Sequence, residues 1–247
     1  MNAAAEFCLR LGDSDLVLSQ RLGEWCGHGP VLEEDLALTN VALDLLGQAR
    51  LWLTLAGDLE AEAGGQHRTE DDLAFLRDAG QFRNLLLVEQ PNGDYAQTMT
   101  RQYLFDAWHL PLLNALAAGG PERIAAIAAK AQKEAAYHLR RSRDWVVRLG
   151  DGTPESHRRM QTALDGLWPF TGEMFAADAV DNAVVPLTDL QTPWREEVSA
   201  TLALATLELP ASAWMQKGGK QGVHSEKLGH LLAEMQFLQR AYPGAQW

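Results

Sequence analysis

Apolar residues recur at intervals of three and four along nearly the whole chain, which is the period of a helix with one buried face. No convincing stretch alternates between apolar and polar residues as a half-buried strand does. Glycine, proline and helix-capping residues interrupt the helical pattern at intervals. The pattern therefore predicts an all-α fold, with helices near 13–26, 33–62, 70–88, 94–118, 122–149, 154–168, 194–208 and 223–240.

The connections between these predicted helices are short, so successive helices should pack antiparallel in one bundle. We expect the long helices 33–62, 94–118 and 122–149 at its centre. Between about 170 and 192 the pattern weakens and predicts no regular element. Since no linker or repeat divides the sequence, it predicts a single domain over 1–247.

Each of the three central helices carries a row of core-facing residues that one strongly polar side chain interrupts. The interruptions are Gln48, Asp106 and His138. Burying such a group without a partner costs about 1–3 kcal/mol, so we expect the three to contact one another. The rows are Leu38, Val41, Leu45, Gln48, Trp52, Leu55 and Leu59; Met99, Tyr103, Asp106, Leu110 and Leu113; and Ala128, Ala131, Ala135, His138, Ser142, Trp145 and Leu149.

Two interpretations of these polar positions compete. A di-iron centre in a helical bundle needs several carboxylates and a Glu-x-x-His pair on each of two helices. The rows supply only the carboxylate of Asp106 and the imidazole of His138, which follows an alanine, Ala135, at the position three residues earlier. Asp44 and Glu134 lie one position outside the rows, about 100° around the helix.

The other interpretation is a buried polar cluster without chemistry. Asp106, His138 and Gln48 would then satisfy one another, with Arg141 or Arg50 reaching in, and would fix how the helices align. The rows alone are compatible with both interpretations.

Composition limits the classes of partner. The chain has 33 acidic and 21 basic residues and a net charge of −12, which disfavours binding to nucleic acid or to anionic membranes. The two cysteines, Cys8 and Cys26, are too few for a disulfide framework or a thiolate zinc site and fit a reducing compartment. Without a long apolar run or a signal peptide, the protein is expected to be soluble and cytoplasmic.

One short stretch stands out as basic and flexible. Residues 217–222 read KGGKQG and precede the helix predicted from 223. Glycines let backbone N–H groups approach an anion, and a helix N-terminus adds partial positive charge. The stretch is not a phosphate-binding Walker loop, because Gln221 follows Lys220 and no strand precedes it. A solvated loop is the alternative interpretation.

Six long segments of the sequence, from loops as well as helices, are distinctive together. They are RLGEWCGHGP (21–30), ALDLLGQAR (42–50), NLLLVEQPNGDYA (84–96), KEAAYHLRRS (133–142), GGKQGVHSEKLG (218–229) and LAEMQFLQRAYPGAQW (232–247). Together they resemble the C subunits of the phenylacetyl-CoA epoxidase complexes of aerobic phenylacetate degradation, and the resemblance runs from about Leu9 to Trp247.

The resemblance implies a ferritin-like helical bundle with additional C-terminal helices, distantly related to the di-iron A subunit of the same complex. The iron ligands of that subunit fall here on two would-be Glu-x-x-His pairs and on two further positions. Only Asp106 and His138 keep a ligand-type side chain, so the resemblance implies a metal site that has been lost, with no metal in this chain. The six positions are Gln20, Leu45, Gln48, Asp106, Ala135 and His138.

The resemblance also implies a role and partners. The expected role is a non-catalytic structural subunit, without catalytic residues, of a monooxygenase that converts phenylacetyl-CoA to its ring 1,2-epoxide. The expected partners are the di-iron A subunit, a small B subunit and a reductase that carries flavin and an iron–sulfur centre and uses NADPH. The resemblance is also compatible with contacts between two C subunits within the complex. Because the substrate is a CoA thioester, the candidate phosphate contacts are Lys217, Lys220, His224 and Lys227.

Two rival functions stay open at this point. One is an autonomous metal-binding oxidase that uses Asp44, Asp106, Glu134 and His138. The other is a helical adaptor that has no connection with oxygenase chemistry.

Overall fold

The computed structural model describes residues 2–245, and the regular structure within that range is helical, without a strand. This confirms the all-α prediction. Met1, Gln246 and Trp247, at the ends of the predicted domain 1–247, lie outside the described residues. The chain contacts divide it into two compact units, Met1–Glu89 with Gly218–Trp247 and Gln90–Lys217. The single domain stays a prediction.

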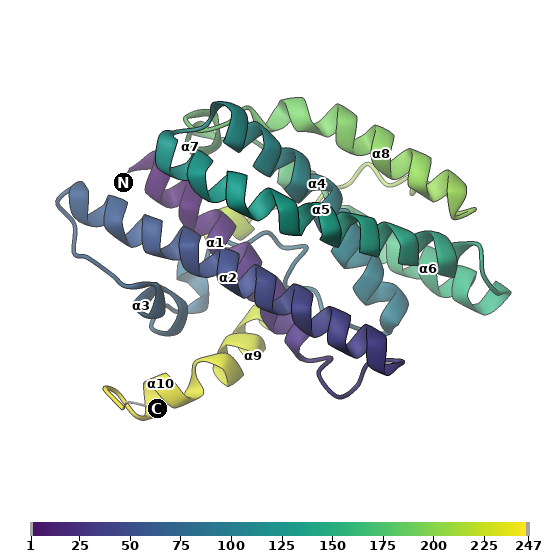
Figure 1. The fold of residues 1–247 in the computed structure, drawn as a ribbon, viewed down its shortest axis with the longest axis horizontal. Helices are drawn as coiled ribbons and strands as arrows, with labels where there is room; N and C mark the ends of the chain where they lie inside the picture. Colours follow the sequence, from purple (N-terminus) through teal and green to yellow (C-terminus); the bar gives the residue numbers. More distant parts are fainter. Residues whose placement is uncertain (1, 246–247) are drawn as a thin grey trace. The chain divides into compact units, whose positions relative to one another are not determined.

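The first unit is built on two long helices that pack side by side, α1 (Ala3–Gly23) and α2 (Leu32–Glu62) (Figure 1). The short helix α3 (Glu70–Phe75) and the 3₁₀ turn η1 (Ala79–Gln81) follow α2. The C-terminal part of the chain adds the 3₁₀ turn η5 (Gly219–Gln221) and the helices α9 (Glu226–Met235) and α10 (Phe237–Ala241). The predicted core row of α2 is buried from Leu38 to Leu55.

Helix α1 begins ten residues earlier than the predicted start at 13. The side chain of Asn2 caps it, because its Oδ1 accepts from the backbone N–H of Ala4 at 3.0 Å. The helix is buried nearly all round, and Asp13 and Asp15 are among its fully buried residues. The sequence pattern therefore missed the first half of this helix.

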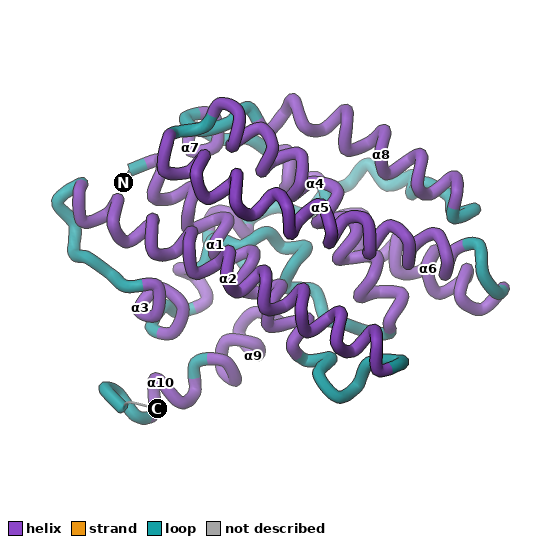
Figure 2. Tube along the Cα trace, viewed as in Figure 1, coloured by secondary structure: helices purple, strands orange, loops and turns teal. Residues whose placement is uncertain are grey.

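The helix predicted over 70–88 is wrong beyond residue 75. The backbone from Phe82 to Glu89 is not helical but forms loops and turns, shown as a loop-coloured tube in Figure 2. Side chains of α1 take up its N–H groups: Asp13 Oδ2 accepts from the N–H of Arg83 at 2.8 Å, and Ser14 Oγ accepts from the N–H of Leu85 at 3.1 Å. These tertiary partners replace the hydrogen bonds that a helix would make.

The second unit is built on α4 (Tyr95–Gly119) and α5 (Glu122–Gly150), which also pack side by side. Helix α6 (Pro154–Leu167) packs on both, and α8 (Gln191–Leu204) contacts the same pair. Between α6 and α8 the chain makes only short elements, in the region where the pattern predicted no regular structure. They are η2 (Trp168–Phe170), η3 (Gly172–Phe175), α7 (Ala179–Asn182) and η4 (Leu187–Leu190).

Two predicted ends near the C-terminus also need correction. The helix predicted over 194–208 ends at Leu204, and the helix predicted over 223–240 begins at Glu226 and is interrupted at Gln236. The side-chain amide of Gln236 donates to the carbonyl of Ala74 at 2.9 Å and to that of Arg77 at 3.0 Å. The break in the helix therefore lies where its side chain is drawn onto α3 and the turn after it.

Candidate functional site

Asp106 lies at the centre of a buried polar cluster in the second unit. It projects from α4 and is 1% exposed. The side-chain amide of Gln102, one turn earlier, donates to Oδ1 at 2.7 Å, and the hydroxyl of Ser142 on α5 donates to Oδ2 at 2.7 Å. Both carboxylate oxygens therefore already have hydrogen-bond donors from the protein.

The electrostatics of this cluster favour neutral groups. Burial raises the pKa of Asp106 from 3.8 to about 6, although His138 and the hydrogen bonds from Ser142 and Gln102 act in the opposite direction. Burial, assisted by His138, lowers the pKa of His109, one turn after Asp106, to about 3. A site that holds two multiply charged metal ions requires anionic ligands instead.

Two of the six metal positions lie on α5. His138 carries a side chain that can bind a metal, and Ala135 carries only a methyl group. His138 is buried and lies close enough for its charge to act on Asp106. Ala135, one turn earlier, is also buried and offers no donor atom. Arg141, one of the two arginines expected to reach in, is nine-tenths buried and influences Asp106 as well. Asp106, His138 and Arg141 are therefore all buried, as the predicted cluster requires, while the hydrogen bonds to the carboxylate of Asp106 come from Gln102 and Ser142. That Asp106, His138 and Gln48 contact one another stays a prediction.

The remaining metal positions belong to the first unit. Leu45 and Gln48 face the core of α2, while Gln20 near the end of α1 is only partly buried. Arg50 does not reach inward as expected: it is exposed, and its Nε donates to Glu70 Oε1 at 3.1 Å. None of the three metal positions in this unit carries a carboxylate.

The structure gives no support to the rival metal-binding oxidase. Its extra carboxylates, Asp44 and Glu134, are partly exposed on the flanks of their helices. Within residues 2–245, no group of three or more histidine, cysteine, aspartate or glutamate side chains is arranged to hold a metal ion.

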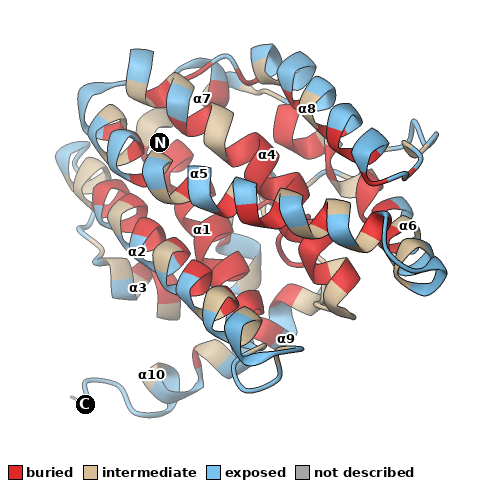
Figure 3. Ribbon diagram, turned by 45° about the vertical axis from the view of Figure 1, so that its right-hand side comes forward, coloured by how far each residue is buried: buried red, intermediate tan, exposed pale blue. Residues whose placement is uncertain are grey.

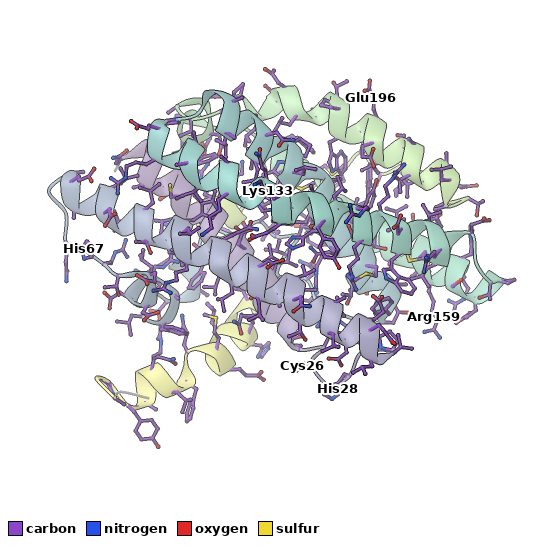
Figure 4. All side chains as sticks on the ribbon, viewed as in Figure 1. Cys26, His28, His67, Lys133, Arg159 and Glu196 are labelled. Carbon is purple, nitrogen blue, oxygen red and sulfur yellow. The ribbon has the colours of Figure 1, made fainter. Side chains whose placement is uncertain are left out.

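Exposed cysteine and histidine side chains of the first unit lie at separate places as well. Figure 4 labels Cys26 and His28 in the turn after α1, at the opposite end of α2 from His67. The Nδ1 atom of His28 contacts the carbonyl of Cys26 at 3.1 Å, which is a local turn contact.

The basic loop before α9 is arranged differently from the prediction. Lys217 is exposed, Lys220 is buried, and Lys227 is partly buried on α9. His224 is tied into the first unit: Nδ1 lies 2.9 Å from Glu89 Oε2, and Nε2 lies 3.0 Å from the carbonyl oxygen of Phe82. Since both partners are acceptors, both ring nitrogens carry protons and His224 is an imidazolium.

Glu89 is the fully buried partner of this imidazolium. It also accepts from the N–H of Ser225 at 2.8 Å and from the side-chain amide of Asn84 at 3.1 Å. Burial alone would raise the pKa of Glu89, but the hydrogen bonds from His224 and Ser225 lower it. Burial likewise opposes the charge on His224, yet the hydrogen bonds to Glu89 and Phe82 raise its pKa. His224 therefore anchors the C-terminal segment, and both its nitrogens are occupied.

A second buried ion pair in the first unit was missed from the sequence. Asp13 on α1 is 0% exposed and receives hydrogen bonds from Nη1 and Nη2 of Arg77. Arg83 joins this group by donating from Nε to Glu6 Oε1 at 3.0 Å. The available signal was a pair of acidic residues, Asp13 and Asp15, within an otherwise apolar stretch.

Comparisons with known proteins agree with this picture. The model of the family described as phenylacetic acid catabolic protein matches residues 1–247. The chain belongs to this family. The C subunit of 1,2-phenylacetyl-CoA epoxidase from Escherichia coli (strain K12) is 53% identical over 253 residues, which cover 100% of both chains.

Membership places the chain in phenylacetate catabolism and confirms the resemblance drawn from the sequence. The all-helical fold, with its two pairs of long helices, is consistent with a ferritin-like bundle. Among the residues that the structure describes, no helix combines the length and the apolar character needed to span a membrane.

Proposed function

We propose that this chain is a non-catalytic structural subunit of a cytoplasmic phenylacetyl-CoA 1,2-epoxidase. The di-iron A subunit would carry out the oxygen chemistry, and a B subunit and an NADPH-dependent reductase with flavin and iron–sulfur centres would complete the complex. The full-length similarity to a protein named as the C subunit of this epoxidase supports the assignment.

The non-catalytic role rests on the donor atoms at the six metal positions. Leu45 and Ala135 occupy the glutamate positions of the two Glu-x-x-His pairs, Gln20 falls near a third carboxylate position, and Gln48 replaces a histidine. The remaining carboxylate, on Asp106, is buried with a raised pKa and holds hydrogen bonds from Gln102 and Ser142. These residues do not fit a pair of iron ions.

The test is reconstitution of the complex with and without this chain. Co-expression with the A subunit is expected to give a heteromer that forms epoxide. Without this chain, the A subunit is expected to form no epoxide. Metal analysis of the chain purified alone should find far less than one iron per molecule. A near-stoichiometric iron content that disappears in the Asp106→Asn and His138→Ala variants would contradict the proposal.

The proposed phosphate contacts are the accessible lysines, Lys217 and Lys227. Both ring nitrogens of His224 already have partners in Glu89 and Phe82, and Lys220 is buried. Replacing exposed Lys217 by alanine in the assembled complex is expected to raise KM for phenylacetyl-CoA several-fold and to leave kcat unchanged, because the CoA end takes no part in the chemistry. Lys133→Ala, at another exposed lysine, is the matched control. An unchanged KM for the Lys217 variant would remove this contact from the proposal.

A further inference from the structure

Helix α2 carries apolar side chains on the face that points away from its core row. Leu32, Leu36, Leu43 and Leu46 are exposed, and Leu43 and Leu46 are 59% and 41% exposed as whole residues. Figure 3 shows this helix with exposed and partly exposed positions along its length. A surface helix normally presents charged or polar residues there, so a row of exposed leucines on one helix indicates a contact surface.

A groove with a volume of about 580 Å³ lies beside these leucines, lined by residues of α2 and α3. Leu43, Leu46 and Gly47 of α2 form one wall, and Ala74 and Phe75 of α3 form the other. Its remaining lining residues are Leu16, Ala49, Arg50, Leu53, Glu70 and Asp71.

Gly47 keeps this groove open at the middle of α2. It is exposed, and a Cβ atom placed on it would meet no atom within 4 Å. A glycine in the interior of a helix lowers helix stability relative to alanine. In this position it allows the backbone of another helix to approach closely, since no side chain stands between them.

The charges at the groove decide what kind of helix fits it. Glu70 and Asp71 line the α3 side. Arg50 and Glu70 pair at 3.1 Å and offset each other's charge, so the net negative charge of the groove lies at Asp71. The chain as a whole has a net charge of −12. A second copy would therefore bring a strongly negative chain to an acidic groove, which is electrostatically unfavourable, whereas a cationic helix is attracted to it.

We propose that this groove, defined by Leu43, Leu46, Gly47, Ala74 and Phe75, binds an amphipathic helix of the catalytic subunit of the epoxidase. The occupant places apolar side chains between α2 and α3 and a lysine or arginine against Asp71, in the manner of a helix laid into a groove. The inference rests on the proposed function for the identity of the partner, but the location and chemistry of the groove come from this chain.

The test is the variant Gly47→Trp, which places an indole at the groove from a position where an added Cβ atom meets no other atom within 4 Å. Binding to the purified catalytic subunit of the same organism is measured by biolayer interferometry, and the variant's thermal unfolding is followed by circular dichroism. We expect at least 100-fold weaker binding with an unchanged or higher unfolding temperature. Gly166→Trp is the matched control, because Gly166 is also an exposed helical glycine with open space around it. It should bind like the wild type.

A second variant tests the charge of the occupant. Asp71→Lys is expected to weaken binding about tenfold and to reduce the loss of affinity that salt causes, while Asp165→Lys, at an exposed acid of α6, should do neither. Equal binding by the wild type and Gly47→Trp would show that the groove is not the binding site for the catalytic subunit, and it would leave the proposed function intact. No binding of the wild type to the catalytic subunit would instead overturn the proposed function and this inference together. If the chain forms a homodimer that Gly47→Trp disrupts while heteromer formation is unaffected, a second copy of this chain and not the catalytic subunit occupies the groove.

Discussion

Replacing Arg77 by methionine is expected to lower the free energy of unfolding by about 3–5 kcal/mol, the usual loss when one partner of a buried ion pair is removed. The guanidinium of Arg77 donates hydrogen bonds to Asp13. Asp13 is fully buried and also accepts from the N–H of Arg83 at 2.8 Å. Methionine fills much of the same volume but leaves the carboxylate of Asp13 without its counter-charge. Urea unfolding monitored by circular dichroism measures the difference.

The matched control for this variant is Arg158→Met. Arg158 also pairs with a carboxylate, that of Glu155 at 2.9 Å, but both side chains are exposed and the pair lies within one turn of α6. Surface pairs of this kind contribute little to stability, so the control should unfold like the wild type. An Arg77 variant as stable as the control would show that Asp13 is not held as an ion pair.

Replacing Asp106 by asparagine is expected to stabilise the protein above pH 6. The pKa of this carboxyl is raised from 3.8 to about 6, so the unfolded state releases the proton first as the pH rises. The free energy of unfolding of the wild type therefore falls between about pH 4 and pH 6. Because one pKa unit corresponds to about 1.4 kcal/mol, the loss reaches about 3 kcal/mol above that range. Asparagine cannot ionise and avoids this loss.

Urea unfolding at pH 4 and pH 8 checks this second prediction. Because Gln102 can turn its side-chain amide and Ser142 can rotate its hydroxyl, both can form hydrogen bonds with asparagine. The variant should match the wild type at pH 4 and exceed it at pH 8, whereas Asp165→Asn at an exposed site should change neither. A variant less stable than the wild type at both values would mean that the ionised carboxylate is needed.

The core rows show which features of the structure can be predicted from the helical period. The positions of Gln48, Asp106 and His138 on buried faces were predicted from spacing alone and are confirmed, because which residues share a helix face depends only on 3.6 residues per turn. The partners of Asp106 were predicted only in part. Gln102 lies one turn away on the same helix but was not among them, since its spacing shows that it can reach Asp106 and does not show that it turns inward.

The segment 76–88, wrongly predicted as helix, shows the opposite case. Its consecutive apolar residues and the helix cap at Thr69 fit a helix, yet the chain leaves the helix after Phe75. The backbone N–H groups of Arg83 and Leu85 find Asp13 and Ser14, about 70 residues earlier in the chain. Local periodicity contains no information about such partners.

The sequence by itself determined the all-α class, most of the long helices and the core rows, because these follow from residue type and spacing, which are local properties. Its resemblance to the epoxidase C subunits identified the metal positions, of which Gln20, Leu45 and Ala135 lack the expected carboxylate. The tertiary structure decided which buried charges are paired, that His224 is held by Glu89, and that a groove opens beside Gly47. Those features join residues far apart in the chain, so only the folded backbone brings them within hydrogen-bonding or van der Waals distance.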